Sequence, residues 1–282
     1  GQADIAVGNV VRSNVLNVLL ILGLSAAIVP LAVDRVLVRV DLPLVVAASV
    51  VATLLMLDGQ LSRGDGAVLV VGLAGYLALQ AWRARHGRAQ LDAPESASTP
   101  PWLLGAYAVG GLIALVVGSR LLVTGATGIA AALGISDLVI GLTVVALGTS
   151  LPEVATSLVA ALRGERDIAV GNVVGSNLFN LLAVLGLSGV AAPTGLPVAA
   201  NAVGLDLPLM VAVAVGAWLF GATGARIGRS EGALLLFGYV AYTALLTMGI
   251  REVGVVVWVG MALVIAGAAW VDARQARRAH PQ

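Results

Sequence analysis

Long apolar segments separated by short polar connections make up most of this chain. A run of about 17 to 25 apolar residues is long enough to cross a lipid bilayer as an α-helix. The pattern predicts nine membrane-spanning helices, at 7–30, 42–58, 66–82, 102–123, 137–162, 168–192, 206–224, 231–249 and 253–271. Several of these segments contain Gly or Pro, so we expect bends in them. We therefore predict an all-α polytopic membrane protein.

The composition fits this class. Of the 282 residues, 59% are hydrophobic and 11% are charged, against about 25% charged residues in an average soluble domain. The chain has no cysteine, which excludes disulfides and thiolate metal sites. The histidines, His86 and His280, lie in polar connections, which excludes a histidine proton relay within the membrane. No serine stands beside an evident base either, so we do not expect an enzyme.

The arginines are distributed unevenly between the two sides of the predicted helices. One side carries Arg35, Arg39, Arg83, Arg85, Arg88, Arg163, Arg166, Arg226, Arg229, Arg274, Arg277 and Arg278. The other side carries Arg63 and Arg251, while Arg12 and Arg120 fall inside or at the end of spans. Because positively charged connections stay in the cytoplasm, the first side is predicted to be cytoplasmic, together with the C-terminus.

A carboxylate, Glu153, lies in the middle of the fifth predicted helix. A charge at the centre of a span costs on the order of 2.5–3.5 kcal/mol on insertion scales, so a buried Glu indicates a functional site. In a continuous helix, Thr149 and Ser150 would share the face of Glu153. Pro152 has no N–H, so we expect it to bend the helix and to free the carbonyl of Gly148.

The sixth predicted helix carries a polar stripe. Asn172, Ser176 and Asn180 recur at intervals of four residues on one face. Carboxylate, hydroxyl, amide and free carbonyl oxygens are hard ligands, which suit sodium or calcium rather than zinc or copper. Small polar residues also serve packing and interhelical hydrogen bonds, which is the role we expect for Thr143, Ser157 or Asn172 taken singly.

An internal repeat runs through the chain. Residues 4–25, DIAVGNVVRSNVLNVLLILGLS, match residues 167–188, DIAVGNVVGSNLFNLLAVLGLS. The match continues with Asp41-Leu42-Pro43 against Asp206-Leu207-Pro208, Arg63 and Gly66 against Arg229 and Gly232, and Gly72 and Tyr76 against Gly238 and Tyr242. The two copies of the first helix are five spans apart, an odd number, so they must cross the membrane in opposite directions. Inverted repeats of this kind build secondary transporters, with the site near the midplane between them.

The repeat also sets the predicted units. Two predicted helices precede the second copy, whereas residue 1 already lies at the start of the match, so we expect roughly 60 to 65 further residues before it, with a partner for Glu153. The units are 1–82, the remainder of the first repeat, with three helices; 83–101, a cytoplasmic linker; 102–249, the second repeat, with five helices; and 250–282, an extra helix and a basic cytoplasmic tail. We expect this tail to set topology and not to bind nucleic acid.

Three motifs resemble a known family. GTSLPE at 148–153, GNVVGSNLFN at 171–180 and GNVVRSNVLN at 8–17 resemble the alpha repeats of the sodium/calcium exchanger superfamily, the cation/calcium antiporters. The resemblance extends over nearly the whole chain. It implies exchange of sodium for calcium by alternating access in a lipid bilayer, with both ions as transported substrates and no cofactor. The small size and the lack of a large regulatory loop favour a bacterial-type inner membrane.

The resemblance also implies a set of ion ligands. They are Glu153 as the main ligand, Thr149 and Ser150 through side chain or backbone, Ala146 through its carbonyl, Ser176 and Asn180 from the following helix, and Ser13 and Asn17 from the first repeat.

Arg12 departs from the family pattern, because the second repeat has Gly175 at that place. A permanent charge beside Ser13 could occupy a cation's place, repel calcium or turn away from the site, and we expect an altered cation stoichiometry. Proton- or potassium-linked calcium exchange stays open, because Asn17 and Asn180 are neutral where some relatives are acidic. A transport-inactive half-exchanger or membrane subunit is the rival from another class.

Overall fold

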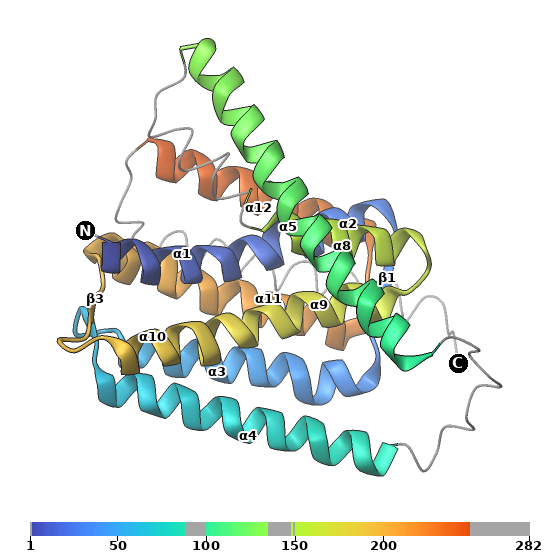
Figure 1. The fold of residues 1–282 in the computed structure, drawn as a ribbon, viewed down its shortest axis with the longest axis horizontal. Helices are drawn as coiled ribbons and strands as arrows, with labels where there is room; N and C mark the ends of the chain where they lie inside the picture. Colours follow the sequence, from blue (N-terminus) through green and yellow to red (C-terminus); the bar gives the residue numbers. More distant parts are fainter. Residues whose placement is uncertain (1, 88–99, 135–147, 149, 249–282) are drawn as a thin grey trace, which may run out of the picture.

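The computed structural model describes residues 2–87, 100–134, 148 and 150–248, and these are almost entirely helical (Figure 1). The helices are α1 (Gln2–Leu16), α2 (Gly23–Ile28), α3 (Leu42–Leu55), α4 (Arg63–Gly87), α5 (Pro101–Ala132), α8 (Leu151–Leu162), α9 (Arg166–Leu178), α10 (Gly186–Ala191), α11 (Leu207–Gly224) and α12 (Arg229–Thr247). Four π-helical segments continue some of them: η1 (Asn17–Leu22), η2 (Leu37–Asp41), η4 (Phe179–Leu185) and η5 (Ala202–Asp206). Seven helical stretches in the described ranges are long and apolar enough to cross a membrane.

These seven stretches coincide with seven of the nine predicted spans. The fifth predicted span is described only at Gly148, Ser150 and the short helix α8, and the ninth, at 253–271, lies outside the described residues. The helical, polytopic membrane class predicted from the hydrophobic pattern is therefore confirmed. Helix α4 continues to Gly87, past the predicted start of the linker at Arg83.

The predicted end of the fourth span at residue 123 is wrong, because α5 continues to Ala132. The polar residues that seemed to end the apolar run are satisfied within the helix. The hydroxyls of Ser119 and Thr124 donate to the carbonyls of Leu115 and Arg120, each one turn earlier, at 2.7 and 2.8 Å. A hydroxyl bonded in this way does not end a membrane helix.

The predicted start of the second span at residue 42 is also wrong, because the helical backbone already begins in η2 at Leu37. Asp41 appeared to be a polar boundary residue, but it is buried and its Oδ1 accepts a hydrogen bond from Arg83 Nη1 at 2.9 Å. An ion pair with α4 makes this carboxylate compatible with the helix interior.

The π-helical segments occur at matching places in the two repeats. Segments η1 and η4 lie in the first helix of each copy and include Asn17 and Asn180 respectively. Segments η2 and η5 end at the aspartate of the two Asp-Leu-Pro sequences, Asp41 and Asp206. The proline two residues later has no N–H to give to the preceding turn, which favours a wider turn there. Short π segments are often found at functional sites.

The two copies run in opposite directions. In Figure 1, α1, η1 and α2 run from left to right, whereas α9, η4 and α10 run from right to left. The helices α3 and α4 of the first copy are likewise reversed in α11 and α12 of the second. The inverted repeat predicted from the sequence match is therefore present in the fold.

The last helix of each repeat packs against the helix of the other repeat that carries the matching 22-residue sequence (4–25 or 167–188). Helix α4 packs against α10, and α12 packs against α2. The contacts are backbone to backbone: a Cβ on Gly66 would lie 2.6 Å from Val190 N, and a Cβ on Gly232 would lie 2.5 Å from Ala27 N. At the ends of these contacts, Arg63 donates to the carbonyl of Val190 at 3.1 Å, and Arg229 to that of Ile28 at 3.5 Å.

Two short antiparallel ribbons join the repeats at the ends of the bundle. Strand β1 (Leu31–Ala32) pairs with β4 (Arg226–Ile227), and β2 (Gln60–Leu61) pairs with β3 (Leu196–Pro197). Each ribbon takes one strand from each copy, and Figure 1 shows β1 and β3 at opposite ends. The two repeats are therefore interlocked along their length and at both ends.

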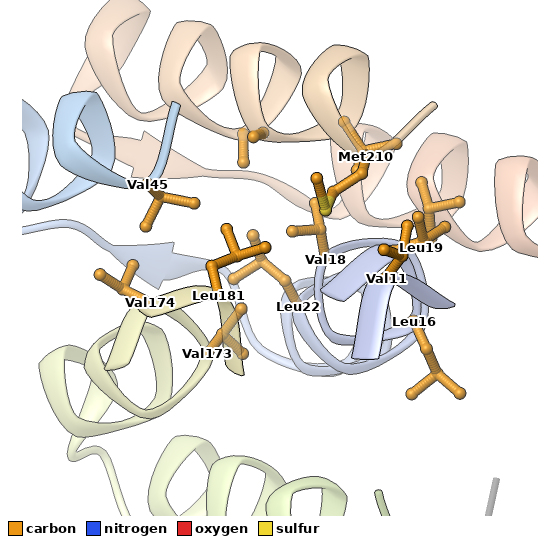
Figure 2. Close-up of a cluster of buried hydrophobic side chains, with 14 of the residues drawn as sticks. Val11, Leu16, Val18, Leu19, Leu22, Val45, Val173, Val174, Leu181 and Met210 are labelled. Carbon is orange, nitrogen blue, oxygen red and sulfur yellow. The ribbon is translucent and has the colours of Figure 1, made fainter. Parts of the chain in front are cut away.

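The apolar core lies where the repeats meet. Figure 2 shows Val11, Leu16, Val18, Leu19 and Leu22 of α1 and η1 facing Val173, Val174 and Leu181 of α9 and η4, with Val45 of α3 and Met210 of α11 beside them. Leu181 and Val11 are fully buried. The polar residues of α1 and α9 are thus held inside a well-packed apolar surrounding.

We predict that Gly66→Ala and Gly232→Ala each destabilise the protein by about 1–3 kcal/mol, because the added methyl would overlap backbone atoms of the other repeat. The measurement is the midpoint of thermal unfolding of the purified protein in detergent. Gly75→Ala is the matched control on α4, since its Cβ would meet nothing within 4 Å. Equal midpoints for all three variants would contradict the close backbone packing at Gly66 and Gly232.

Candidate functional site

Glu153 lies in the first turn of a short helix. Helix α8 begins at Leu151, directly after Ser150, which has a turn conformation. Pro152 therefore stands where a missing N–H costs no helical hydrogen bond, and the positive end of the helix dipole favours a carboxylate at Glu153. The continuous helix assumed through Ser150 is not present: Ser150 is the N-cap of α8, and its carbonyl accepts a hydrogen bond from Val154 N at 2.9 Å.

The helix that carries Glu153 is attached to the polar stripe of α9. Asn172 Nδ2 donates to the carbonyl of Glu153 at 3.3 Å and to Ser157 Oγ at 2.9 Å. Ser157 Oγ donates in turn to the carbonyl of Ala169 at 3.3 Å. The interhelical role expected for Ser157 and Asn172 is confirmed, whereas Thr143 lies outside the described residues.

Four asparagines meet where α1 and η1 cross α9 and η4. Asn17 Nδ2 donates to Asn177 Oδ1 at 2.8 Å, and Asn180 Nδ2 donates to Asn14 Oδ1 at 3.0 Å. Asn14 Nδ2 also donates to the carbonyl of Asn177 at 3.4 Å. Asn14, Asn17 and Asn177 are each 2% exposed. Because η1 packs against α9 and α8, these amides lie in the same layer of the bundle as the Glu153 helix.

Two oxygens of the predicted ligand set are buried without a partner. Among the described residues, neither Glu153 Oε2 nor Asn17 Oδ1 accepts a hydrogen bond. A buried acceptor without a donor costs about 1–3 kcal/mol, so native proteins rarely keep one without a reason. Both atoms are hard oxygen ligands, and α8 packs against η1, so the arrangement fits the binding of a cation such as calcium or sodium.

Three further predicted ligands within the described residues are serines. Ser13 is half-buried on α1, and Ser176 is half-buried on α9, where its hydroxyl donates to the carbonyl of Asn172. Ser150 is buried. Ala146 and Thr149 lie outside the described residues.

The structure adds Asn14 and Asn177, which were not among the predicted ligands. They directly follow the two predicted serine ligands, as Ser13-Asn14 and Ser176-Asn177. Because this Ser-Asn pair occurs at the same place in both copies of the repeat, the sequence match could have indicated them.

Arg12 has a partner that the sequence did not identify. Its Nε donates to Asp206 Oδ2 at 3.0 Å, and the hydroxyl of Tyr242 donates to the other oxygen of the same carboxylate at 2.8 Å. Asp206 is fully buried, while the Arg12 side chain is 29% exposed. The carboxylate at the end of η5 thereby joins α1, through an ion pair, and α12, through a hydrogen bond.

Asp41, the repeat partner of Asp206, is neutralised in a different way. Arg83 and Gln80 of α4, in the same repeat, donate to Asp41 Oδ1 at 2.9 and 3.3 Å. Continuing the repeat match from Tyr76 and Tyr242, the second copy has Leu246 and Gly249 at these two places. Among the described residues, Asp206 has no cationic partner from its own repeat, and Arg12 supplies one from the other.

Comparisons with known proteins give the family. The model of the sodium/calcium exchanger protein family matches residues 1–82 and 103–248. The chain belongs to the sodium/calcium exchanger family. Cation/calcium antiport is thus its class of activity, and this family consists of transporters rather than enzymes.

Relatives of this chain include bacterial and archaeal membrane proteins. It is 38% identical over 258 residues to the inner membrane protein YrbG of Escherichia coli, covering 87% of this chain and 78% of that protein. It is 43% identical over 133 residues to the sodium/calcium exchanger MaX1 of Methanosarcina acetivorans, covering 47% of this chain and 37% of that protein.

A solved structure of the sodium–calcium exchanger NCX_Mj, soaked with sodium and strontium, has the same fold. It superposes with a TM-score of 0.71 and 34% sequence identity, over 86% of this chain and 77% of that chain.

We predict that Arg12→Gly destabilises the exchanger by about 1–3 kcal/mol, because Asp206 loses its cation while it stays buried. Adding Asp206→Asn should restore part of the thermal midpoint, since the uncompensated charge is then removed. The sodium and calcium dependence of transport should be the same in the double variant and the parent. A changed stoichiometry in the double variant would instead support a direct role of Arg12 in ion binding.

Proposed function

We propose that this chain exchanges sodium for calcium by alternating access, with Glu153 as the main ion ligand. The observation that carries the proposal is the pair of buried, unpartnered oxygens, Glu153 Oε2 and Asn17 Oδ1, on two elements that pack together between inverted repeats. The hydroxyls of Ser13, Ser150 and Ser176 and the amide of Asn180 belong to the same proposed ligand set. Ala146 and Thr149, which lie outside the described residues, complete it.

The chemistry of these ligands explains how two ions would be coupled. Calcium takes about six to eight oxygen ligands, with carboxylates preferred, so one calcium ion needs most of the cluster. Sodium ions would use the same oxygens, and the two ions therefore compete for one site. A bound ion biases the inward-facing or outward-facing state only through its difference in affinity for the two.

The distribution of arginines supports a cytoplasmic side. Eight arginines of the described residues lie at one end of the bundle, around β1, the end of α4, the turn between α8 and α9, and β4: Arg35, Arg39, Arg83, Arg85, Arg163, Arg166, Arg226 and Arg229. The opposite end, around β2 and β3, has Arg63 among the described residues. We infer that the arginine-rich end faces the cytoplasm and that the membrane is a bacterial-type inner membrane.

We predict that Glu153→Gln abolishes calcium exchange, because a neutral amide offers neither the charge nor the second anionic oxygen that calcium requires. The measurement is uptake of radioactive calcium into everted membrane vesicles, driven by an outward sodium gradient at fixed pH. Glu165→Gln, an identical change at an exposed position in the α8–α9 turn, is the matched control and should leave uptake unchanged.

The same assay decides between the coupling ions. Uptake that requires sodium and is indifferent to potassium and to a proton gradient is the expected result. Uptake that follows the proton gradient, or that requires potassium, would assign the protein to those branches of the family instead. Calcium uptake retained in Glu153→Gln would overturn the site.

We predict opposite accessibility at the two ends of the bundle. The chain has no cysteine, so single cysteines give an unambiguous signal. Thr194→Cys, next to β3, should react with a membrane-impermeant maleimide in intact cells, whereas Glu165→Cys should react only after permeabilisation. The reverse result would invert the proposed orientation.

A further inference from the structure

The four asparagines at the helix crossing form two reciprocal pairs. By the repeat match, Asn14 corresponds to Asn177 and Asn17 corresponds to Asn180. The first pair is Asn17 donating to Asn177, and the second is Asn180 donating to Asn14. Each bond therefore joins a proposed ion ligand of one repeat to the preceding asparagine of the other, and the two bonds are related by the inverted symmetry.

The chemistry of a primary amide makes these bonds directional. An amide is planar, with the oxygen and the nitrogen on opposite sides of the same carbon, so fixing the nitrogen also fixes the oxygen. Asn177 Oδ1 binds the nitrogen of Asn17 at 2.8 Å, and Asn17 Oδ1 stays buried and unpartnered among the described residues. The bond thus determines which atom of Asn17 is free to bind a cation.

The amide of Asn14 is itself held in place. Asn14 Nδ2 donates to the carbonyl of Asn177 at 3.4 Å and lies 3.8 Å from the sulfur of Met210. With its nitrogen occupied in this way, Asn14 presents its oxygen to Asn180, at 3.0 Å. Both Asn14 and Asn177 are 2% exposed, so water is a poor substitute for either of them.

We propose that Asn14 and Asn177 are positioning residues, which orient the amides of Asn180 and Asn17 so that their oxygens, and not their NH2 groups, face the transported cation. This inference rests on the proposed function, since it assumes that Asn17 and Asn180 bind the ion. Because each positioning residue belongs to the opposite repeat, ion affinity depends on the register between the two repeats.

The test is the calcium concentration that gives half-maximal sodium-driven uptake in vesicles. We expect Asn177→Leu and Asn14→Leu each to raise it about fivefold to tenfold, because each removes the buried acceptor that orients one proposed ligand. Asn177→Asp keeps the acceptor for Asn17 and should stay within about twofold of the parent. Asn201→Leu, an identical change at a partly buried asparagine outside the cluster, should leave the value unchanged.

A double variant separates positioning from simple packing. If Asn177 acts through Asn17, then Asn177→Leu should add no further loss of affinity in an Asn17→Ala background. Independent, additive losses would overturn the proposal, as would an Asn177→Asp variant as weak as Asn177→Leu. If the leucine variants do not fold, Asn177→Ala and Asn14→Ala carry the same test.

The outcomes also distinguish this inference from the proposed function. Loss of uptake in Glu153→Gln together with unchanged half-saturation in the leucine variants would reject the positioning role alone. Uptake retained in Glu153→Gln would reject the ion site itself, and the positioning role with it.

Discussion

Polar groups within a bilayer have to find their partners inside the protein, because lipid offers none. The crossing of α1 and η1 with α9 and η4 satisfies this requirement for several amides at once. Asn17 and Asn180 each donate across the crossing, and the surrounding residues are Val, Leu and Met. Among the described residues, the crossing leaves one buried amide oxygen, Asn17 Oδ1, without a hydrogen bond, and the neighbouring helix α8 brings one such carboxylate oxygen, Glu153 Oε2. The proposed ion site would therefore use oxygens that the packing of the repeats leaves without a partner.

The two buried aspartates follow the same requirement and show how inverted repeats diverge. Asp41 is neutralised by Arg83 within its own repeat, whereas Asp206 is neutralised by Arg12 from the other. From the sequence, Arg12 appeared to interfere with the proposed ion site. In the structure it instead neutralises Asp206, which has no cationic partner among the described residues of its own repeat. Arg12 need not be counted among the ion-binding residues, because its guanidinium already forms an ion pair with the fully buried carboxylate of Asp206.

The fold was largely predictable from the sequence, because membrane helices are fixed by length and hydrophobicity and because the two copies share recognisable motifs. Predicted span ends failed where polar residues were satisfied internally, as at Ser119, or paired at a distance, as at Asp41. The candidate residues Asn17, Asn180 and Glu153 lie on elements that meet. The hydrogen bonds of Asn17 and Asn180 could not be predicted, because each joins residues about 160 or more positions apart in the sequence, and spacing along one helix does not show how two helices cross.

Helices α4 and α12 each pack against the opposite repeat, and these contacts affect how the two repeats could move relative to one another. Both helices lie against the opposite repeat through glycines, where backbone approaches backbone closely. Contacts of this kind permit sliding along the helix axis more readily than separation, because separation would open a gap in the packing. A shift of one repeat would then be transmitted to the other through α4 and α12. Alternating access around a fixed central site is the motion that inverted repeats favour, and the glycine contacts of this fold are compatible with it.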